Sequence, residues 1–385
     1  MTHHHAADAY APEPNVIEQQ AKRYLEHTSR AATDPAPDRP LAPAIRRVQR
    51  RAVGWAVVAG LVSGGLIGGA ELVASDFASS GEAGGGTIEG WLADWHIWVA
   101  FLAFAGVVSA IEILFLYWTA LRATADFTTL AGTRLSGHPH GELVGRGLAR
   151  GGLEFPNPQT LIFGIDAYAR VPKWQVWARN VLYKLKVGVS SFLLRLFLRR
   201  VLGRMLVRGI IPLAAGPLYA VWNAIITWRI GREARLRVFG PRVVEDLVAS
   251  FGQEPELREP AFRDRLFDGV GELVMRGHDA HPNFVLLLSS LREDLGHAAD
   301  EIAVDWDETR QSLGSLTERQ QRAAMATWTL TALLGSRIYA GQRALLDEAA
   351  RAFGSSFDPA ALRQLRGDLL DGRRIEPAEL AVAPS

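Results

Sequence analysis

The sequence predicts an all-α membrane protein that combines a transmembrane helical hairpin, basic helices at the membrane interface and a cytoplasmic helical bundle. Three observations predict this class: two long runs almost without charge, a sharp separation of positive from negative charge along the chain, and a carboxyl-terminal part with regular helix-capping signals. A chain of 385 residues exceeds one ordinary hydrophobic core, so we expect more than one structural unit.

Two apolar runs are long enough to cross a bilayer. Residues 52–70 contain no charged residue, and residues 97–121 contain one, Glu112. Because about 20 residues are enough to cross the hydrocarbon core, we predict transmembrane helices at about 52–74 and 97–121. The alternative is a pair of buried core helices in a soluble protein, which the length of the runs and their flanking charges disfavour.

Flanking charges predict the orientation of this hairpin. Arginines precede the first span and follow the second, whereas the intervening loop carries only acidic charge. By the positive-inside rule, both outer ends are cytoplasmic and the loop with GEAGGG lies outside. Trp91, Trp95 and Trp98 stand where an interfacial aromatic belt is expected. We therefore expect a protein of the bacterial cytoplasmic (inner) membrane with both termini in the cytoplasm.

Glu112 is the intramembrane candidate for a functional residue. A carboxylate in hydrocarbon is costly and normally faces a partner or a water-filled cavity. It lies about ten residues, or roughly 15 Å of helix, from the cytoplasmic end, too deep for a short side chain to reach the interface. Two roles stay open for it: transport, and a protonated, hydrogen-bonded structural residue.

Gly60, Gly64 and Gly68 recur every four residues in the first span and therefore share one helical face. Such a face lets the backbone of another helix approach closely. We predict packing against the second span of the same chain, because this partner is already tethered to the first span. Association of two copies is the alternative, so a homo-oligomer stays open.

The stretch LLRLFLRRVLGRMLVRG, residues 193–209, alternates apolar side chains with arginines and contains no acidic residue. As a helix it has an apolar face bordered by arginines, which fits a membrane interface with cations reaching anionic lipid phosphates. A buried protein interface is an alternative. Nucleic acid is not expected as a partner, because the apolar content is too high. The predicted lipid-phosphate ligands are Arg195, Arg199, Arg200, Arg204 and Arg208.

Residues 209–228 form a third uncharged run, with Pro212 and Pro217 inside it and basic residues at both ends. We predict a broken or re-entrant apolar hairpin here, with a third span as the alternative. The overlapping stretch GPLYAVWNAIITWRIGREARLRVFG, residues 216–240, combines a turn, an apolar helix with an asparagine and a basic end in Phe-Gly. In this order it resembles the membrane-associated segment of EcsC-like bacterial proteins. The resemblance implies membrane association and carries no catalytic residue.

Residues 241–385 are acidic, with 16 arginines against 24 Asp or Glu, and show a helical pattern. A capping box at Thr317 and Gln320 and a helix start at Asp358 support it. Several helices joined by short turns form an all-α bundle. The predicted helices are 260–276, 283–296, 298–312, 317–335, 339–353 and 359–371.

Within the bundle, ALLGSRIYAGQRALLDEAARAFGSSFDPAALRQLRGDLLDG, residues 332–372, contains an apolar helix, a glycine turn and an acid-bearing helix that ends in Ala-Phe-Gly. This segment resembles the second half of a TerB-like domain, a helical module of bacterial tellurite-resistance and membrane-linked stress systems. The resemblance implies ion binding through acids at the turn, but Gly335-Ser336 stands where Asp-Gly is expected. Asp347 and Glu348 are therefore interpreted as solvated helix charges.

His278, Asp279 and His281 are weak candidates for metal ligands, because they form a close His–Asp cluster. They precede a helix that starts with proline, so capping is the favoured interpretation and no metal is predicted, nor one at His3–His5. The chain has no cysteine, which excludes thiolate chemistry. No Walker, kinase, Gly-x-Ser-x-Gly or His-Glu-x-x-His motif is present. We expect no cofactor and no enzymatic activity.

These observations predict a non-enzymatic scaffold or stress-response adaptor, which anchors a partner-binding helical domain to anionic lipid. The alternative is an oligomeric transporter or channel component that uses Glu112. The partners expected are anionic membrane lipids and a protein bound by the bundle. The predicted segments are a disordered tail (1–45), the transmembrane hairpin (46–122), a cytoplasmic connector (123–166), a basic interfacial region (167–240) and the acidic bundle (241–385).

Overall fold

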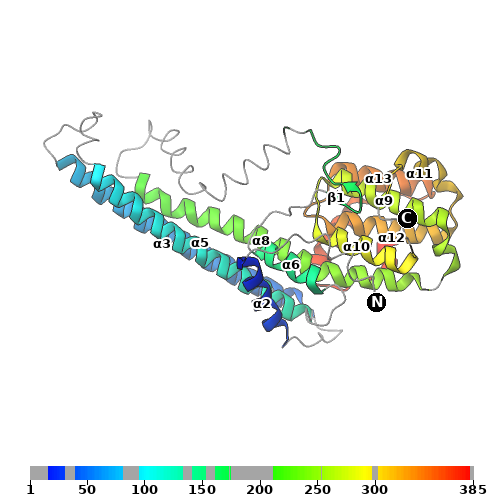
Figure 1. Ribbon diagram of the computed structural model, residues 1–385, viewed down its shortest axis with the longest axis horizontal. Coiled ribbons are helices and arrows are strands. Elements are labelled where there is room, and N and C mark those ends of the chain that lie inside the picture. Colours follow the sequence, from blue (N-terminus) through cyan, green and yellow to red (C-terminus); the bar gives the residue numbers. More distant parts are fainter. Residues whose placement is uncertain are drawn as a thin grey trace. The chain divides into compact units, whose positions relative to one another are not determined.

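The structure, a computed structural model, is almost entirely helical in the part of the chain that it describes, which confirms the predicted all-α class (Figure 1). The described residues are 16–30, 40–80, 95–132, 141–152, 161–172, 174, 211–252, 254–296 and 302–381. The longer helices are α2 (Val16–Ser29), α3 (Ala42–Ser80), α5 (Trp95–Ala131), α6 (Gly141–Gly152), α8 (Ile211–Phe251), α9 (Pro260–Gly277), α10 (Pro282–Leu295), α12 (Glu318–Leu334), α13 (Ala340–Ala352) and α14 (Pro359–Leu370). Shorter elements are β1 (Leu161–Ile162), β2 (Ile165–Asp166), η1 (Pro255–Arg258), α11 (Trp306–Ser312), η2 (Leu313–Ser315) and α15 (Pro377–Ala381).

The chain forms two compact units. The three-helix unit consists of residues 48–123 and 174–231, and the bundle unit consists of residues 1–47, 124–173 and 232–385, in each case within the described ranges. The division falls inside α3, α5 and α8, so each of these helices contributes residues to both units.

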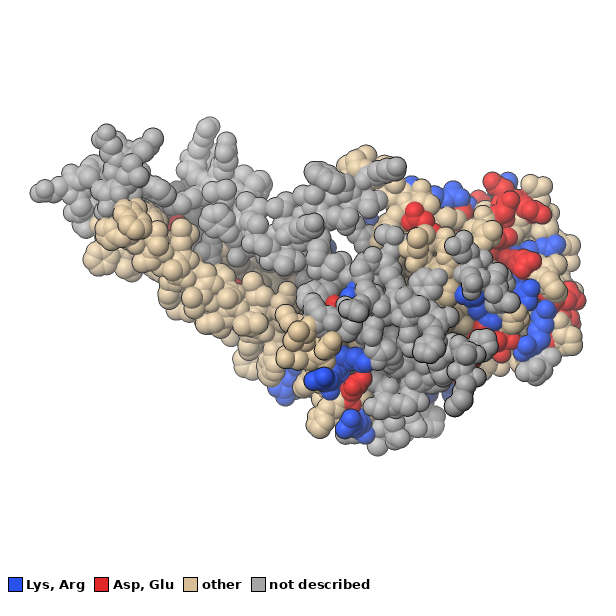
Figure 2. Space-filling view, viewed as in Figure 1, with Lys and Arg blue, Asp and Glu red and all other residues tan. Residues whose placement is uncertain are grey.

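In the three-helix unit, α3 and α5 contain the two predicted spans. The helical segments Ala42–Phe77 and Trp95–Ala131 are long and apolar enough to cross a membrane by length and composition. Only 6% of the most apolar window of α5 is buried, and 33% of that of α3. A core helix of a soluble protein buries its apolar surface, whereas these helices leave most of theirs exposed. Figure 2 shows this surface as a long stretch almost without charge.

The predicted broken hairpin at 209–228 is wrong, because α8 is one continuous helix from Ile211 to Phe251. Pro212 is the second residue of α8, where a backbone N–H has no partner within the helix, so the proline costs little. Pro217 lies in the second turn and removes one hydrogen bond. Close packing of this part of α8 on α3 compensates for that loss, and Figure 1 shows the two helices side by side.

The bundle unit is organised around α12, which is buried on all sides from Ala323 to Leu334. Its Trp328 is fully buried and donates an indole hydrogen bond of 3.1 Å to the carbonyl of Leu266 in α9. A helix that is buried all round is the centre of a core, and the surrounding helices cover it with one apolar face each. The capping box at Thr317 and Gln320 is confirmed.

Two predictions for the bundle and the tail need correction. Of the helix expected at 298–312, residues 298–301 lie outside the described residues and residues 302–305 are not helical. The described helix begins at Trp306, where the Asp305 side chain caps it by accepting from the Glu308 N–H. The tail is also not wholly disordered, since α2 buries Leu25 and its Glu18 forms a salt bridge with Arg150 of α6. The packing that holds this helix was not predictable from a proline-rich composition.

A short hairpin, β1–β2, falls within the predicted connector. Its strands pair antiparallel, with Leu161 opposite Asp166. The turn residues Phe163 and Gly164 both have positive φ, as a two-residue type I′ hairpin turn requires. The Arg292 guanidinium lies over the Phe163 ring at 4.6 Å, so a cation–π contact stabilises a conformation that phenylalanine rarely adopts.

Candidate functional sites

The first site lies in the three-helix unit, where Glu112 of α5 meets Asn223 of α8. The Asn223 side-chain amide donates a hydrogen bond of 2.6 Å to Glu112 Oε1. Asn223 is 4% exposed, whereas Glu112 is partly exposed. The contact joins α5 to α8, so this lone carboxylate of an apolar helix has a hydrogen-bonded partner.

No cation from the neighbouring helical segments neutralises this carboxylate. Residues 52–70 of α3 and residues 211–228 of α8 carry no charged side chain. The carboxylate is therefore stabilised by an amide dipole in a largely apolar setting.

The glycine face of α3 packs against α8, and not against α5 as predicted. A Cβ atom at Gly60 would lie 2.6 Å from the backbone N of Ala220, and one at Gly64 would lie 2.5 Å from the Cα of Gly216. Gly68, on the same face, is also buried. The predicted partner was wrong because residues 209–228 were expected to be a broken hairpin, which offers no continuous helical surface.

Aromatic and basic residues surround one end of the three-helix unit. Trp55, Trp118 and Trp228, one from each helix, are 52%, 50% and 47% exposed. Exposed arginines accompany them, and the guanidinium of one, Arg122, lies 5.3 Å from the centre of the Trp118 ring. The exposed arginines at this end are Arg50, Arg51, Arg122 and Arg229.

A second aromatic position lies at the other end of α5. Trp95 is 58% exposed and precedes Trp118 by 23 residues, which correspond to about 35 Å of helix. This separation fits the roughly 30 Å hydrocarbon core with an aromatic residue at each interface. Glu112 then lies six residues, or about 9 Å, inside the level of Trp118.

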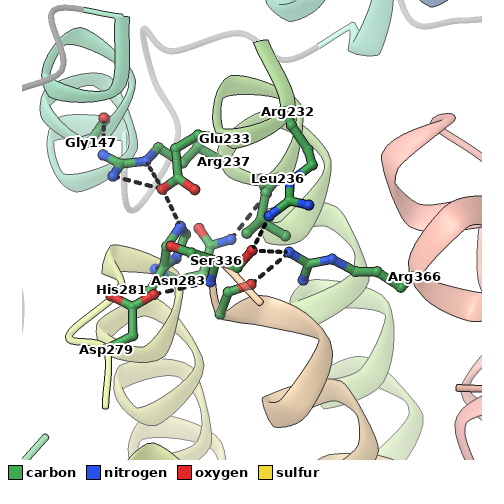
Figure 3. A network of polar contacts seen from close by, with 11 residues as sticks. Gly147, Arg232, Glu233, Leu236, Arg237, Asp279, His281, Asn283, Ser336 and Arg366 are labelled. Atoms are coloured by element: carbon green, nitrogen blue, oxygen red, sulfur yellow. Dashed lines mark hydrogen bonds and ion pairs between the residues drawn. The ribbon is translucent and has the colours of Figure 1, made fainter. Parts of the chain in front are cut away.

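The second site is a polar network in the bundle unit (Figure 3). His281, 1% exposed, has its Nε2 at 2.9 Å from Glu233 Oε1, and its Nδ1 accepts from the Asn283 N–H. Because Nδ1 is an acceptor, we assign the ring proton to Nε2, which donates to Glu233. Arg237 also donates to Glu233 Oε1, and its Nη1 reaches the carbonyl of Gly147 in α6.

Electrostatics keep Glu233 ionised. Burial tends to raise its pKa, but the positive charge of Arg237 and the hydrogen bonds from His281 and Arg237 outweigh burial and hold the pKa well below the usual range of a glutamate. Two donors engage the same carboxylate oxygen, so Glu233 is not a free general base. The network ties α6, α8 and α10 together.

The same network secures the turn after α12. Arg366 donates to the carbonyls of Gly335 and Ser336, and Arg232 donates to the Ser336 carbonyl at 2.8 Å. These contacts satisfy acceptors beyond the helix end, where helical carbonyls lack partners. Burial, followed by repulsion from Arg232, lowers the pKa of Arg366 to about 10, against the opposing attraction of Glu233 and Asp279.

The three weak metal candidates have separate roles. His281 is the N-cap of α10, as the loop pattern predicted. Asp279 accepts from the Ser336 N–H at 3.0 Å, and His278 follows α9 with φ of 48° and packs its ring against Tyr339. Among the described residues, no group of three or more His, Cys, Asp or Glu is arranged to hold a metal ion.

Other predicted residues have different outcomes. The five predicted lipid-phosphate ligands, Arg195 to Arg208, lie outside the described residues. Glu348, expected to be solvated, accepts from the indole N–H of Trp306 at 3.4 Å. Asn223 and Glu233 were not predicted as site residues. A signal was present for Asn223, since it is a lone amide in an apolar run, but Glu233 resembles any charge of a surface helix.

Comparison of the chain with models of protein families, with curated proteins and with solved structures finds no match. The sites above are therefore interpreted from their own geometry.

Proposed function

We propose that this chain is an integral protein of the cytoplasmic membrane, which anchors a helical adaptor domain there. In this proposal the three-helix unit lies in the bilayer and the bundle unit binds a protein partner in the cytoplasm. The observation that carries the membrane placement is the exposed apolar surface of α5 between Trp95 and Trp118, whose length matches a bilayer core.

The arginines at the Trp118 end support contact with anionic lipid. Arg50, Arg122 and Arg229 are exposed beside half-exposed tryptophans, an arrangement that suits the headgroup layer of a negatively charged leaflet. By the positive-inside rule this end is cytoplasmic.

An adaptor role is supported by the character of the bundle unit. Its central polar residues are engaged by one another, while acidic side chains such as Asp307 and Glu318 are 87% and 89% exposed. The resemblance of residues 332–372 to TerB-like domains agrees with a helical module of membrane-linked stress systems. A rigid bundle with an exposed charged surface is suited to recognition more than to catalysis.

The test has two parts. The full chain in its membrane should resist extraction with alkaline carbonate and dissolve in detergent. A photo-crosslinking residue at Asp307 or Glu318 should then give a discrete protein adduct in intact cells, whereas the same residue at Val107, 60% exposed on the apolar surface of α5, should give none. Extraction by carbonate would refute the anchor, and the absence of adducts from both bundle positions would refute the adaptor.

A transport role for Glu112 is the second candidate, because its side chain stays partly exposed beside the hydrogen bond from Asn223. The variant Glu112→Gln keeps a hydrogen-bonding side chain but loses the titratable group. If the chain moves protons or cations, this substitution should abolish flux in proteoliposomes. Equal flux through the variant and the unaltered chain would eliminate this role.

A further inference from the structure

Three buried polar side chains lie at one level of the three-helix unit. Gln49, Thr119 and Thr227 are 8%, 5% and 4% exposed. The Gln49 amide donates to the Thr227 carbonyl at 3.5 Å, which places α3 beside α8 at this level. The rings of Trp55 and Phe115 are in contact at 6.2 Å, and α3 and α5 run in opposite directions, so Thr119 lies within about one turn of the level of Gln49.

Within the part of the chain that the structure describes, two polar atoms of this layer have no hydrogen-bond partner. They are Gln49 Oε1 and Thr119 Oγ1, both fully buried. Other threonines of α5 bond to their own helix, as Thr128 does to the Thr124 carbonyl at 2.9 Å. Thr119 makes no such bond, so its hydroxyl is free for another partner. Buried polar atoms of this kind are usually satisfied by ordered water.

The buried polar residues of this layer lie in line with the Glu112–Asn223 pair along the interior of the three-helix unit. Thr119 follows Glu112 by seven residues, two turns along one face of α5, and Thr227 follows Asn223 by four, one turn along α8. Polar groups therefore occur at intervals of one to two turns between the arginine-bearing end and the carboxylate.

On the other side of the pair, the interface between α3 and α8 is closed. Beyond Asn223, α8 approaches α3 until Ala220 meets Gly60 and Gly216 meets Gly64, with no room for a Cβ atom. The hydroxyl of Ser63, at this level, is directed to the Gly60 carbonyl at 3.4 Å. The backbone contact leaves no space for water between these two helices.

We propose that water enters the three-helix unit from the arginine-bearing end, binds at Gln49, Thr119 and Thr227, and reaches Glu112. The Glu112 carboxyl is then accessible to water from one side of the membrane only. The ligand class is water. This inference rests on the proposed membrane placement, but not on the adaptor role.

Because the chain has no cysteine, single cysteines can test the proposal. Three variants are compared, each in sealed vesicles of both orientations. Thr119→Cys lies in the polar layer, Ser63→Cys lies at the level where α3 and α8 are in close contact, and Val107→Cys lies on the exposed apolar surface. The probe is a charged, membrane-impermeant methanethiosulfonate, which reacts with the thiolate and therefore needs water at the thiol.

We expect Thr119→Cys to react from the arginine-bearing side only, at least about tenfold faster than Ser63→Cys or Val107→Cys, because an apolar setting suppresses the thiolate. If Thr119→Cys reacts no faster than Ser63→Cys, the proposed water path is refuted. Rapid reaction of Val107→Cys from outside the bilayer would instead refute the membrane placement, so the two failures are distinguishable.

A second measurement uses the unaltered chain, in case the variants do not insert. A water-soluble carbodiimide with an amine nucleophile converts a water-accessible carboxyl to an amide, and mass spectrometry locates the product. We expect modification of Glu112 when the reagents are added at the arginine-bearing side, and none from the opposite side. Absence of the Glu112 amide from both sides, while exposed carboxyls are modified, would contradict the proposal.

Discussion

The side-chain amide of Asn223 donates a hydrogen bond of 2.6 Å to Glu112 Oε1 and thereby joins α8 to α5. The surrounding segments, 97–121 and 211–228, carry no other charged side chain. The two residues are 111 positions apart in the sequence. Each alone is a costly polar group in an apolar helix, and the fold brings them together as one satisfied pair.

Removing one member of the pair should cost more than removing both. Asn223→Leu leaves the carboxylate without this donor, which we expect to lower the free energy of unfolding by about 1–3 kcal/mol. The double variant Asn223→Leu with Glu112→Leu should recover part of that loss, because no buried polar group is left unpaired. Thermal unfolding in detergent, arranged as a double-mutant cycle, measures the coupling; simple additivity would show that the hydrogen bond carries no energy.

Two neighbouring glycines of α3 allow a matched test of the α3–α8 contact. A Cβ at Gly64 would lie 2.5 Å from the Gly216 Cα, whereas one at Gly65 would have no atom within 4 Å. Gly64→Val should therefore destabilise the protein by about 1–3 kcal/mol through overpacking, and Gly65→Val should have little effect. Both are measured by thermal unfolding in the same detergent. An equal effect of the two substitutions would contradict the close contact.

The bundle unit offers a similar pair of glycines for a matched test. At Gly269 a Cβ would lie 2.2 Å from Nε1 of Trp328, and the substitution Gly269→Ala would break the hydrogen bond of this indole to Leu266. We expect a loss of about 1–3 kcal/mol. Gly367 lies in α14 with no atom near its Cβ position, so Gly367→Ala should be neutral or stabilise by about 0.5–1 kcal/mol. Denaturant unfolding of the full chain would reveal whether the two substitutions differ in sign as expected.

Stability should depend on pH through Glu233. Its pKa in the folded protein is lowered, so its ionised form stabilises the fold at neutral pH, and this contribution declines as the pH falls below the unfolded value of about 4.3. Glu233→Gln should therefore be clearly destabilising at pH 7, and the difference from the unaltered chain should shrink below pH 4. If the difference between the two proteins is constant between pH 7 and pH 3, the ionised carboxylate does not contribute as described.

The fold class and the two apolar helices were predictable from the sequence because they depend on local properties. Length, absence of charge and flanking arginines determine whether a segment such as 97–121 suits a membrane. The caps at Thr317 and His281 were predictable for the same reason, since a capping side chain bonds to backbone within three residues. Such features do not require knowledge of distant segments.

The sites depended on the tertiary structure. Glu112 was singled out from the sequence because a lone carboxylate in an apolar run is costly, yet its partner Asn223 is on another helix and had no pairing signal. The glycine face of α3 was likewise evident, but its partner helix was not. The sequence by itself determined which residues were too polar or too small for their surroundings. Only the tertiary structure decided which of them meet, because the cost of burying a polar group or leaving a gap is removed by whichever segment packs there.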